Sequence, residues 1–544
     1  MIISGNYLSG NIGANIKRFE YKNFQVYYKG LIYIPRITEG KESIIRFLDT
    51  NSNDFLKTEC LRGQFMLIIY NILTKDYHVF GDNNGIEKIF HTEQNISDSL
   101  LELIDYNKFN TDDISYKKMF EFLFRGYVYD NQTLIHQIKV LKKEIVIRIQ
   151  DNKMQFLNKK INPFNSLPNS DIYGFFEDFV KSVGHLNITL DLTAGSDSRM
   201  LMALLELNNV NYKVAVAGIS NHKDVVISKS IAHTLNKKWL HYEHDFDTVD
   251  KKSLVHEFQN IFIQTDGQIS VIDSHRKYNY FNMLKSNNSD LHLSGVYGNI
   301  FKDHQWVQDF PFYSSKKSRI DKVISYRIAP IRYNEKKLSS RMSDYSKTYI
   351  SELEKRLNTF KLTINTQTYD NIDCNYKLPV AVSTIAGMAY GCNLNTYEPF
   401  SEQEAIRIGY NLKRKMRFFN NFHRQTITKS CNKISSIRTD KGLTCSSNPY
   451  YVFTDIFVLF YDLSKRLLKQ ILRKLIKKTY FSKTPNDSRI YRYFIETKEY
   501  QLTIEKLKQY DIINPSLDES ILSDTDISRL YTIGLFIEYL EKNK

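Results

Sequence analysis

The chain has 544 residues, of which 42% are hydrophobic, so it is long enough for two or three domains with buried cores. Its formal net charge of +15 is largely diffuse and no base-reading motif accompanies it, which argues against nucleic-acid binding. It contains no apolar run of about 18 residues and no signal-peptide pattern, which excludes a membrane-spanning protein and predicts a cytoplasmic one. Its five scattered cysteines show no metal-binding spacing, which excludes a disulfide scaffold.

Residues 1–158 are predicted to form a mostly β-structured first domain. Short runs of β-branched and aromatic residues between Phe24 and Ile149 alternate with turn residues. The stretch over 162–170 is rich in Pro, Asn and Ser, which is typical of a linker. A second domain is expected over 165–450.

The second domain is predicted to begin as an α/β unit with a parallel sheet. An apolar strand over 186–192 leads into a turn of small residues, and a helical pattern follows from Arg199. A second strand is expected over 213–218, and then a helix over 225–235. From 255 to 430 the pattern is mainly helical.

The residues of the turn are Thr193-Ala194-Gly195-Ser196-Asp197-Ser198. Small residues between a strand and a helix leave backbone N–H groups free to bind an anion, and the helix dipole favours one. The turn is not a P-loop, because no Gly-Lys-Ser/Thr follows. An ordinary corner, in which Ser and Asp only cap the helix, is the alternative interpretation.

The last segment, 451–544, is predicted to be a helical and basic extension. Residues 465–478 carry seven basic residues and no acidic one, and apolar residues recur between them about every four positions. Such a helix can lie on an anionic membrane surface or bind an acidic partner. The simpler interpretation is a surface helix whose basic residues are solvated.

The turn resembles the Ser-Gly-Gly-x-Asp-Ser loop of the ATP pyrophosphatases, and within them that of the asparagine synthetase family. Thr193 stands for the first Ser, and Gly195, Asp197 and Ser198 match. Ala194 replaces the first Gly, which requires a negative φ there. The resemblance implies an α+β first domain with a β-sandwich of the N-terminal nucleophile hydrolase type, followed by an α/β ATP-pyrophosphatase domain with a parallel sheet and many helices.

Other motifs follow in the order of the family and extend the resemblance over roughly 20–445. Residues 63–70 and 80–91 resemble the hairpin and the Arg-Asp-x-x-Gly segment of the glutaminase domain, and 126–141 resembles the segment that joins the two domains. Tyr397-Glu-Pro-Phe-Ser-Glu402 resembles Val-Pro-Phe-Leu-Asp, and Ile437-Arg-Thr-Asp-Lys-Gly442 resembles a later Arg-x-Lys segment.

The first departure from the family is the missing nucleophile. The family glutaminase uses an N-terminal Cys, whereas this sequence begins Met1-Ile2 and its first cysteine is Cys60. We therefore expect the first domain to keep the fold without the glutaminase, which argues against a glutamine-dependent amidotransferase. The amine must then be ammonia or belong to a substrate.

The second departure concerns the Ser-Gly-x-Gly-x-Asp-Glu motif of the family. Its best match begins at Ser294 and Gly295, which fit the nucleotide-contacting positions. The acids are missing: Asn299 stands near one of them, and Asp303 is a candidate to compensate. A site that has lost its chemistry is the alternative.

The resemblance implies a reaction with ATP and Mg²⁺ in which a substrate carboxylate is adenylated, pyrophosphate leaves and an amine attacks. It places Asp197 as metal ligand and Lys441 as the lysine that stabilises the transition state. Glu402 is expected either to anchor a turn or to act as a base. The expected nucleotide-binding residues are Leu192, Thr193, Gly195, Ser196, Asp197, Ser198, Val216, Ala217, Ser294 and Gly295.

The sequence therefore favours an amide-forming synthetase that takes a small-molecule or peptide carboxylate and an amine. The alternative is a non-catalytic scaffold that keeps the fold and binds nucleotide. The resemblance also suggests a homodimer. Asparagine biosynthesis and the modification of a surface polysaccharide or a peptide are the processes in which such relatives act.

Overall fold

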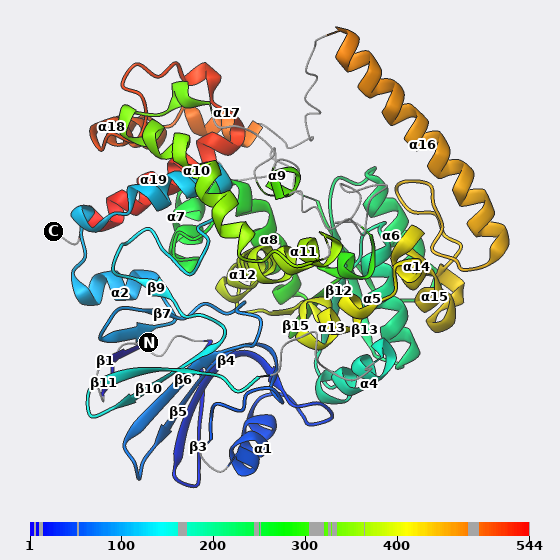
Figure 1. The fold of residues 1–544 in the computed structure, drawn as a ribbon, viewed down its shortest axis with the longest axis horizontal. Coiled ribbons are helices and arrows are strands. Elements are labelled where there is room, and N and C mark those ends of the chain that lie inside the picture. The colour runs from blue at the N-terminus through cyan, green and yellow to red at the C-terminus, as the bar shows by residue number, and fades with distance from the viewer. Residues whose placement is uncertain are drawn as a thin grey trace.

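The computed structural model describes residues 1–4, 7–9, 15–51, 54–161, 171–243, 250, 252–303, 320–324, 328, 334–363, 365–476 and 489–542. For 7–9, 321–322, 365, 462–463 and 466–476 only the backbone is described. The chain combines two antiparallel sheets, one parallel five-stranded sheet and many helices (Figure 1). The expected combination of a β-rich first part with a parallel α/β second part is therefore present.

The first part of the chain forms the two antiparallel sheets. One has the order β2-β1-β8-β7-β9 and the other β11-β10-β6-β5-β4-β3. Their strands are β1 (Ile2–Ser4), β2 (Tyr7–Ser9), β3 (Lys17–Tyr21), β4 (Phe24–Tyr33), β5 (Arg62–Asn71), β6 (Asp76–Gly81), β7 (Phe90–His91), β8 (Asn95–Ser97), β9 (Lys139–Val140), β10 (Ile145–Gln150) and β11 (Lys153–Asn158).

The six-stranded sheet lies between two apolar layers, because successive residues of a strand point to opposite faces. On one face Phe65 of β5 packs in a cluster with Phe47 of helix α1 (Lys41–Asn51). On the other face its neighbour Met66 packs with Ile3 of the five-stranded sheet. This layering explains why β5 is apolar almost throughout rather than alternating.

The parallel sheet has the order β14-β13-β12-β15-β16. Its strands are β12 (Ile188–Asp191), β13 (Tyr212–Ala217), β14 (Trp239–Tyr242), β15 (Leu291–Ser294) and β16 (Asn395–Tyr397). The first two strands and the helices after them, α5 (Ser196–Leu207) and α6 (Lys223–Thr234), agree with the sequence prediction to within a few residues. The strands β15 and β16 were not predicted, since they lie in a stretch that is otherwise helical.

Helices cover both faces of the parallel sheet, which is why its strands are apolar on both sides. On one face Leu190 packs with Leu201 of α5, and on the other Ala215 packs with Phe281. The covering helices include α4 (Ile172–Val183), α5, α8 (Val271–Ser286), α12 (Leu378–Gly391), α13 (Gln403–Asn411) and α15 (Asn421–Ser430). The helices α4, α5, α13 and α15 all contribute residues to the apolar cluster that contains Leu190.

The remaining helices form the largest apolar cluster, to which residues from distant parts of the sequence contribute. Phe120 of the first part, Phe258 of the middle and Phe536 near the end belong to it. Its helices are α2 (Leu100–Asn107), α3 (Tyr116–Arg125), α7 (Leu254–Gln264), α9 (Ile320–Val323), α10 (Ser340–Asn358), α11 (Asn365–Ile372), α17 (Arg489–Ile495), α18 (Lys498–Gln509) and α19 (Asp524–Glu541). The core therefore crosses the predicted boundaries at 158 and 451.

Two further helices complete the chain. The short α14 (Arg414–Arg417) precedes α15, and α16 (Pro449–Ile476) leaves the body of the molecule near α15 (Figure 1, orange). Among the described helices, none has both the length and the apolar composition needed to cross a bilayer. The first part also contains the helices α1, α2 and α3, as expected of an α+β arrangement.

Candidate functional site

The turn singled out from the sequence lies at the edge of the parallel sheet where ligands usually bind. The neighbours of β12 are β13 on one side and β15 on the other, so the loops that follow β12 and β15 run in opposite directions. In open parallel sheets the crevice at such a switch point, outside the carboxyl ends of the strands, is the common ligand site. The turn 193–198 follows β12 and the segment 295–299 follows β15.

The backbone of the turn has the conformation that the sequence required. Ala194 has a negative φ, and Gly195 is the N-cap of α5 with φ −73° and ψ 174°. No side chain caps the helix, so its first N–H groups, those of Ser196, Asp197 and Ser198, have no acceptor inside it. The Oγ atom of Ser198 accepts from the backbone N–H of Thr193 at 3.1 Å, which closes the turn.

Two glycines bring the segment after β15 against the start of α5. A Cβ atom at Gly295 would lie 2.5 Å from the backbone N of Ser198, and one at Gly298 would lie 2.7 Å from Oδ1 of Asp197. Both contacts exclude a side chain. Between the glycines, Tyr297 has φ +73°, an unusual conformation for a bulky residue, and its hydroxyl lies 2.9 Å from Sγ of Cys374.

Turn and segment enclose a cavity of about 400 Å³. Five of the predicted residues line it: Thr193, Asp197, Ser198, Ser294 and Gly295. Lys377, at the end of η7 (Asp373–Lys377), also lines it. Gly195 and Ser196 belong to the same turn and are half-buried. The structure thus places the predicted pyrophosphate residues at one cavity.

The carboxylate of Asp197 is already paired. Lys302 Nζ lies 2.7 Å from Oδ1 and 2.8 Å from Oδ2, and His423 Nε2 lies 2.8 Å from Oδ1. Burial opposes ionisation of Asp197, but Lys302 and His423 outweigh it and hold the pKa of the carboxyl well below its usual range. Burial lowers the pKa of His423 against the effect of Asp197, so the imidazole is neutral at pH 7. The lysine is the charge partner.

These residues do not fit a resident magnesium ion. Mg²⁺ requires near-octahedral oxygen ligands and usually takes one or two carboxylates. The carboxylate that the resemblance assigns to the metal, that of Asp197, has both oxygens occupied by Lys302 and His423. Of the other two carboxylates that line the described cavity, Asp373 is paired with Lys377 and Asp191 accepts from Tyr280. Asn299 offers an uncharged amide where the family motif has an acid, and Asp303 makes no described contact with Asp197. Among the described residues no three His, Cys, Asp or Glu side chains gather to hold a metal.

Lys302 belongs to the segment that resembles the second family motif, and no local pattern predicts its role. It lies four residues beyond Gly298, at the C-cap of η3 (Gly298–Phe301), and reaches Asp197 because Gly298 lets η3 approach α5. His423 comes from α15, more than 200 residues after Asp197, with no local signal in the sequence. Only the tertiary structure shows that Lys302 and His423 contact Asp197.

Glu402 lies outside this cavity, at the contact with the first part of the chain. Its buried carboxylate accepts from the backbone N–H of Gly63 at 3.0 Å, from that of Gln403 at 3.0 Å and from the hydroxyl of Tyr397 at 3.2 Å. Burial raises its pKa, although Arg62 acts in the opposite direction. The geometry is that of an anchor, one of the two roles expected for it.

Lys441 is exposed. It lies in a turn whose neighbouring backbone is hydrogen-bonded to side chains of α5 and α6. The guanidinium of Arg199 is buried and donates to the carbonyl oxygens of Ala194 and Ile437. Lys223 of α6 donates to the carbonyl oxygen of Asp440 at 3.1 Å. Lys441 itself is not among the residues that line the cavity, whereas Lys377 is.

Three of the predicted nucleotide-binding residues lie at the ends of the first two strands: Leu192 directly follows β12, and Val216 and Ala217 end β13. Leu192 and Val216 are buried, and Ala217 is half-buried. A nucleotide base at these positions would therefore meet mainly backbone groups.

A buried polar cluster that the sequence did not indicate lies behind the cavity. Lys277 of α8 makes no hydrogen bond or ion pair with a described residue, and burial lowers its pKa against the charges of Asp191 and Glu398. Glu398 is buried and accepts from Gln64 Nε2 at 2.7 Å. Asp191 lines the cavity and accepts from the hydroxyl of Tyr280 at 3.3 Å.

No protein-family model matches the chain, and no curated protein matches it.

Proposed function

We propose that the chain is an ATP-dependent synthetase of the asparagine synthetase type. It adenylates a substrate carboxylate, releases pyrophosphate and transfers the acyl group to ammonia or to an amine of a substrate. In this proposal the two antiparallel sheets are the inactive glutaminase-type domain, and the parallel sheet with its helices is the ATP-pyrophosphatase domain. Magnesium enters with the nucleotide, as Mg·ATP, and not as a resident ion.

The position of the turn carries the proposal. Thr193, Asp197 and Ser198 line a cavity at the switch point of a parallel sheet, and the open N-terminus of α5 points its N–H groups toward the turn. An ordinary strand–helix corner does not need a second loop packed on it through two glycines, as Gly295 and Gly298 are here.

The residues of the chain would serve the first step by position and charge. Two anions must approach each other, so the barrier falls when fixed donors hold the departing phosphates and a cation neutralises the attacking group. The N–H groups of Ser196, Asp197 and Ser198 are the fixed donors. Lys377, which lies 3.2 Å from Oδ1 of Asp373, is the cation in the cavity wall, and we assign to it the anion contact that the resemblance implied for Lys441.

Two observations favour the alternative of a non-catalytic nucleotide-binding protein. The pairing of Asp197 with Lys302 replaces a free carboxylate by a neutralised one, and the backbone N–H of Ala194 is taken by Oδ1 of Asp224 at 2.7 Å. A carboxylate beside the turn reduces its attraction for phosphate.

Isotope exchange separates the two functions. Purified protein is incubated with Mg·ATP, labelled pyrophosphate and a panel of carboxylic acids, and ATP binding is measured in parallel by calorimetry. The synthetase predicts acid-dependent incorporation of label into ATP. Binding of ATP without exchange for any acid favours the scaffold, and no binding of ATP overturns both.

A matched pair of variants tests the turn itself. A Cβ at Gly195 meets only Thr193 Oγ1, at 3.3 Å, and its φ suits any residue, so Gly195→Ala should bind ATP as the parent does. Gly195→Asp adds an anion at the same position and should weaken ATP binding by about tenfold or more, about 1.4 kcal/mol. Equal binding by the two variants would remove the turn from the nucleotide site.

A further inference from the structure

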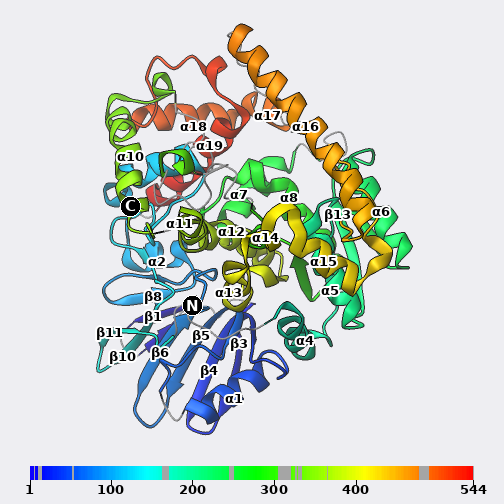
Figure 2. The ribbon, with the colours of Figure 1, turned by 45° about the vertical axis from the view of Figure 1, so that its right-hand side comes forward.

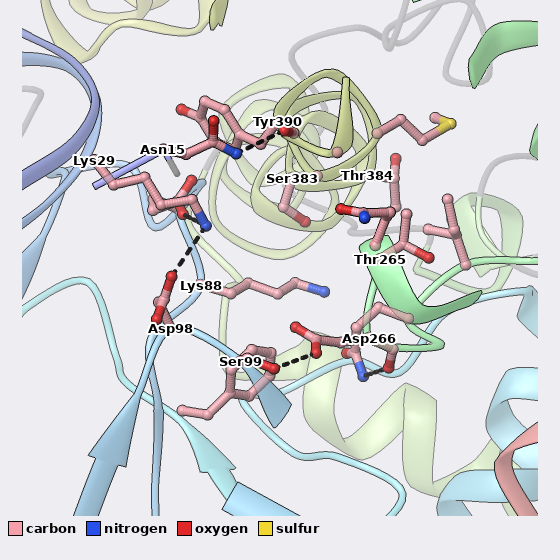
Figure 3. Close-up of a pocket in the computed structure, with 18 of the residues that line it drawn as sticks. Asn15, Lys29, Lys88, Asp98, Ser99, Thr265, Asp266, Ser383, Thr384 and Tyr390 are labelled. Atoms are coloured by element: carbon pink, nitrogen blue, oxygen red, sulfur yellow. Dashed lines mark hydrogen bonds and ion pairs between the residues drawn. The ribbon is translucent and has the colours of Figure 1, made fainter. Parts of the chain in front are cut away.

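A second cavity, of about 200 Å³, lies where the first part of the chain meets the helices of the second. Its wall combines Lys29 and Lys88 from the first part with Asp266, from the loop between α7 and α8, and with Ser383 and Thr384 of α12 (Figure 3). It is distinct from the cavity at the turn and shares no lining residue with it.

Most charged groups of this wall have partners. Lys29 Nζ lies 2.9 Å from Glu87 and 3.6 Å from Asp98, and the α-amino group of Met1 lies 3.2 Å from Asp98. Asp266 accepts from the hydroxyl of Ser99 at 2.6 Å. The wall is therefore organised by its own ion pairs.

Lys88 is the exception. Its ammonium group makes no hydrogen bond or ion pair with any described residue, and in Figure 3 its side chain extends into the cavity between Asp266 on one side and Ser383 and Thr384 on the other. Burial lowers the pKa of Lys88 to about 8, although Asp266 and Glu87 act in the opposite direction. Lys88 is half-buried, and a partly desolvated cation without a partner is costly; an anion that enters the cavity offsets this cost.

The neighbours of Lys88 define the chemistry of such an anion. The hydroxyls of Ser383, Thr384 and Thr265 already donate to backbone carbonyl oxygens, so they can only accept further hydrogen bonds, and Ile86 and Met388 supply apolar surface. Asp266 faces the same space as an acceptor, and burial raises its pKa to about 6. The cavity has room for a small molecule but not for a nucleotide.

We infer that this cavity binds a small carboxylate, whose anionic group pairs with Lys88 and whose hydroxyl or amino group donates to Asp266. The inference does not depend on the function proposed for the turn, because the two cavities are lined by different residues.

Calorimetric titration tests it with acetate, lactate, glycine and glutamate as probes, each up to about 10 mM. We expect at least one probe to bind the parent protein. Lys88→Met should weaken that probe by about tenfold or more, and Lys57→Met, which removes an exposed lysine, should not. The inference is overturned if no probe binds the parent or if Lys88→Met binds as tightly.

A proton-linked measurement distinguishes pairing with Lys88 from a fault in folding. An anion beside Lys88 raises the pKa of its amine, so binding at about pH 9 should take up a proton from solution. Titrations in two buffers of different ionisation enthalpy measure this uptake for the parent. If the parent binds a probe at this pH without proton uptake, Lys88 is not the partner and the inference fails.

A separate observation concerns the surface of α16. Five aromatic side chains near its start are each at least 60% exposed: Tyr450, Phe453, Phe457, Phe460 and Tyr461. Other large exposed apolar residues, such as Leu73 in the β5–β6 turn, are scattered. The helix extends away from the body in both views (Figures 1 and 2). A contiguous aromatic surface of this kind marks an interaction site.

The sequence next to the aromatic surface indicates its partner. Residues 465–478 follow on the same chain with seven basic residues and no acidic one, although the side chains from Arg466 onward lie outside the described residues. Aromatic residues beside lysines and arginines are typical of helices that lie in the interface of an anionic bilayer. We propose that α16 attaches the protein to an anionic lipid surface.

Sedimentation with vesicles tests this proposal. The parent protein should pellet with vesicles of phosphatidylcholine and phosphatidylglycerol, and less with pure phosphatidylcholine or at high salt. A variant with Phe453→Ser, Phe457→Ser and Phe460→Ser should lose binding, whereas Ile72→Ser with Leu73→Ser, which removes exposed apolar residues elsewhere, should keep it. Equal pelleting of both variants, or no pelleting of the parent, overturns the proposal. A dimer of the parent that the triple substitution dissolves would also overturn it and identify a second copy as the partner.

Discussion

Lys302 and Lys88 are two half-buried lysines, each near an aspartate at the wall of a cavity, yet only Lys302 forms an ion pair with a described residue. Lys302 contacts both oxygens of Asp197, and together with His423 it holds that carboxyl in its ionised form. Lys88 makes no hydrogen bond or ion pair with a described residue, and burial lowers its pKa to about 8. The difference indicates that Lys302 is neutralised by an aspartate of the same chain, whereas Lys88 is available to an anion that binds from outside.

The largest effect is expected from breaking the pair at the turn. Asp197→Asn or Lys302→Met leaves the other charge partly buried without its ion-pair partner, which should lower the free energy of unfolding by about 3 kcal/mol. The double variant should cost less than the sum of the two, because both remove the same interaction. Urea denaturation measures all three. As a control, Lys22→Met breaks the exposed pair with Asp49 and should change the free energy of unfolding far less, because water screens that pair.

Removing the unpaired lysine should have the opposite sign. The folded pKa of about 8 lies below the usual 10.5, so the folded state binds fewer protons between these values and stability rises with pH there. Lys88→Met removes this rise and should make the protein more stable near pH 7 by about 2 to 3 kcal/mol. Denaturation at pH 7 and at about pH 10 measures the difference. Parallel pH profiles of parent and variant would contradict it.

The two cavities also differ in whether a glycine of the wall can be replaced by a larger residue. A Cβ at Gly295 would overlap the backbone of α5, so Gly295→Ala should cost about 2 kcal/mol and weaken ATP binding. A Cβ at Gly387, in the wall of the second cavity, would meet nothing within 4 Å, so Gly387→Ala should be neutral or slightly stabilising. Thermal denaturation ranks the two. A harmless Gly295→Ala would show that the two loops need not touch.

The smallest effect is expected from the comparison of Lys377, in the wall of the first cavity, with the exposed Lys441. Lys377→Ala removes a cation from the wall of the first cavity and should slow pyrophosphate exchange by about tenfold or more. Lys441→Ala removes an exposed side chain outside the cavity and should change the rate by less. Exchange kinetics at saturating ATP compare the two variants. The reverse order would return the role in the transition state to Lys441.

Part of the fold was predictable because it depends on neighbouring residues. The strand before Thr193, the turn and the start of α5 follow from apolar periodicity and small residues within about twenty positions. The negative φ of Ala194 was a condition set by the sequence, and the backbone meets it. The strands β15 and β16 were missed because each is only a few residues long and lies among helices; their pairing with β12 and with each other is what makes them strands.

Local sequence by itself determined where the chain bends at 193–198 and which residues it presents there, since steric limits and capping act over a few positions. Only the tertiary structure decided what those residues meet. It brings Lys302 and His423 to Asp197, buries Glu402 against Gly63 and leaves Lys88 facing a cavity. Each of these outcomes joins or separates groups that lie far apart along the chain, and burial, which sets the cost of an unpaired charge, is a property of the packed molecule and not of any single segment.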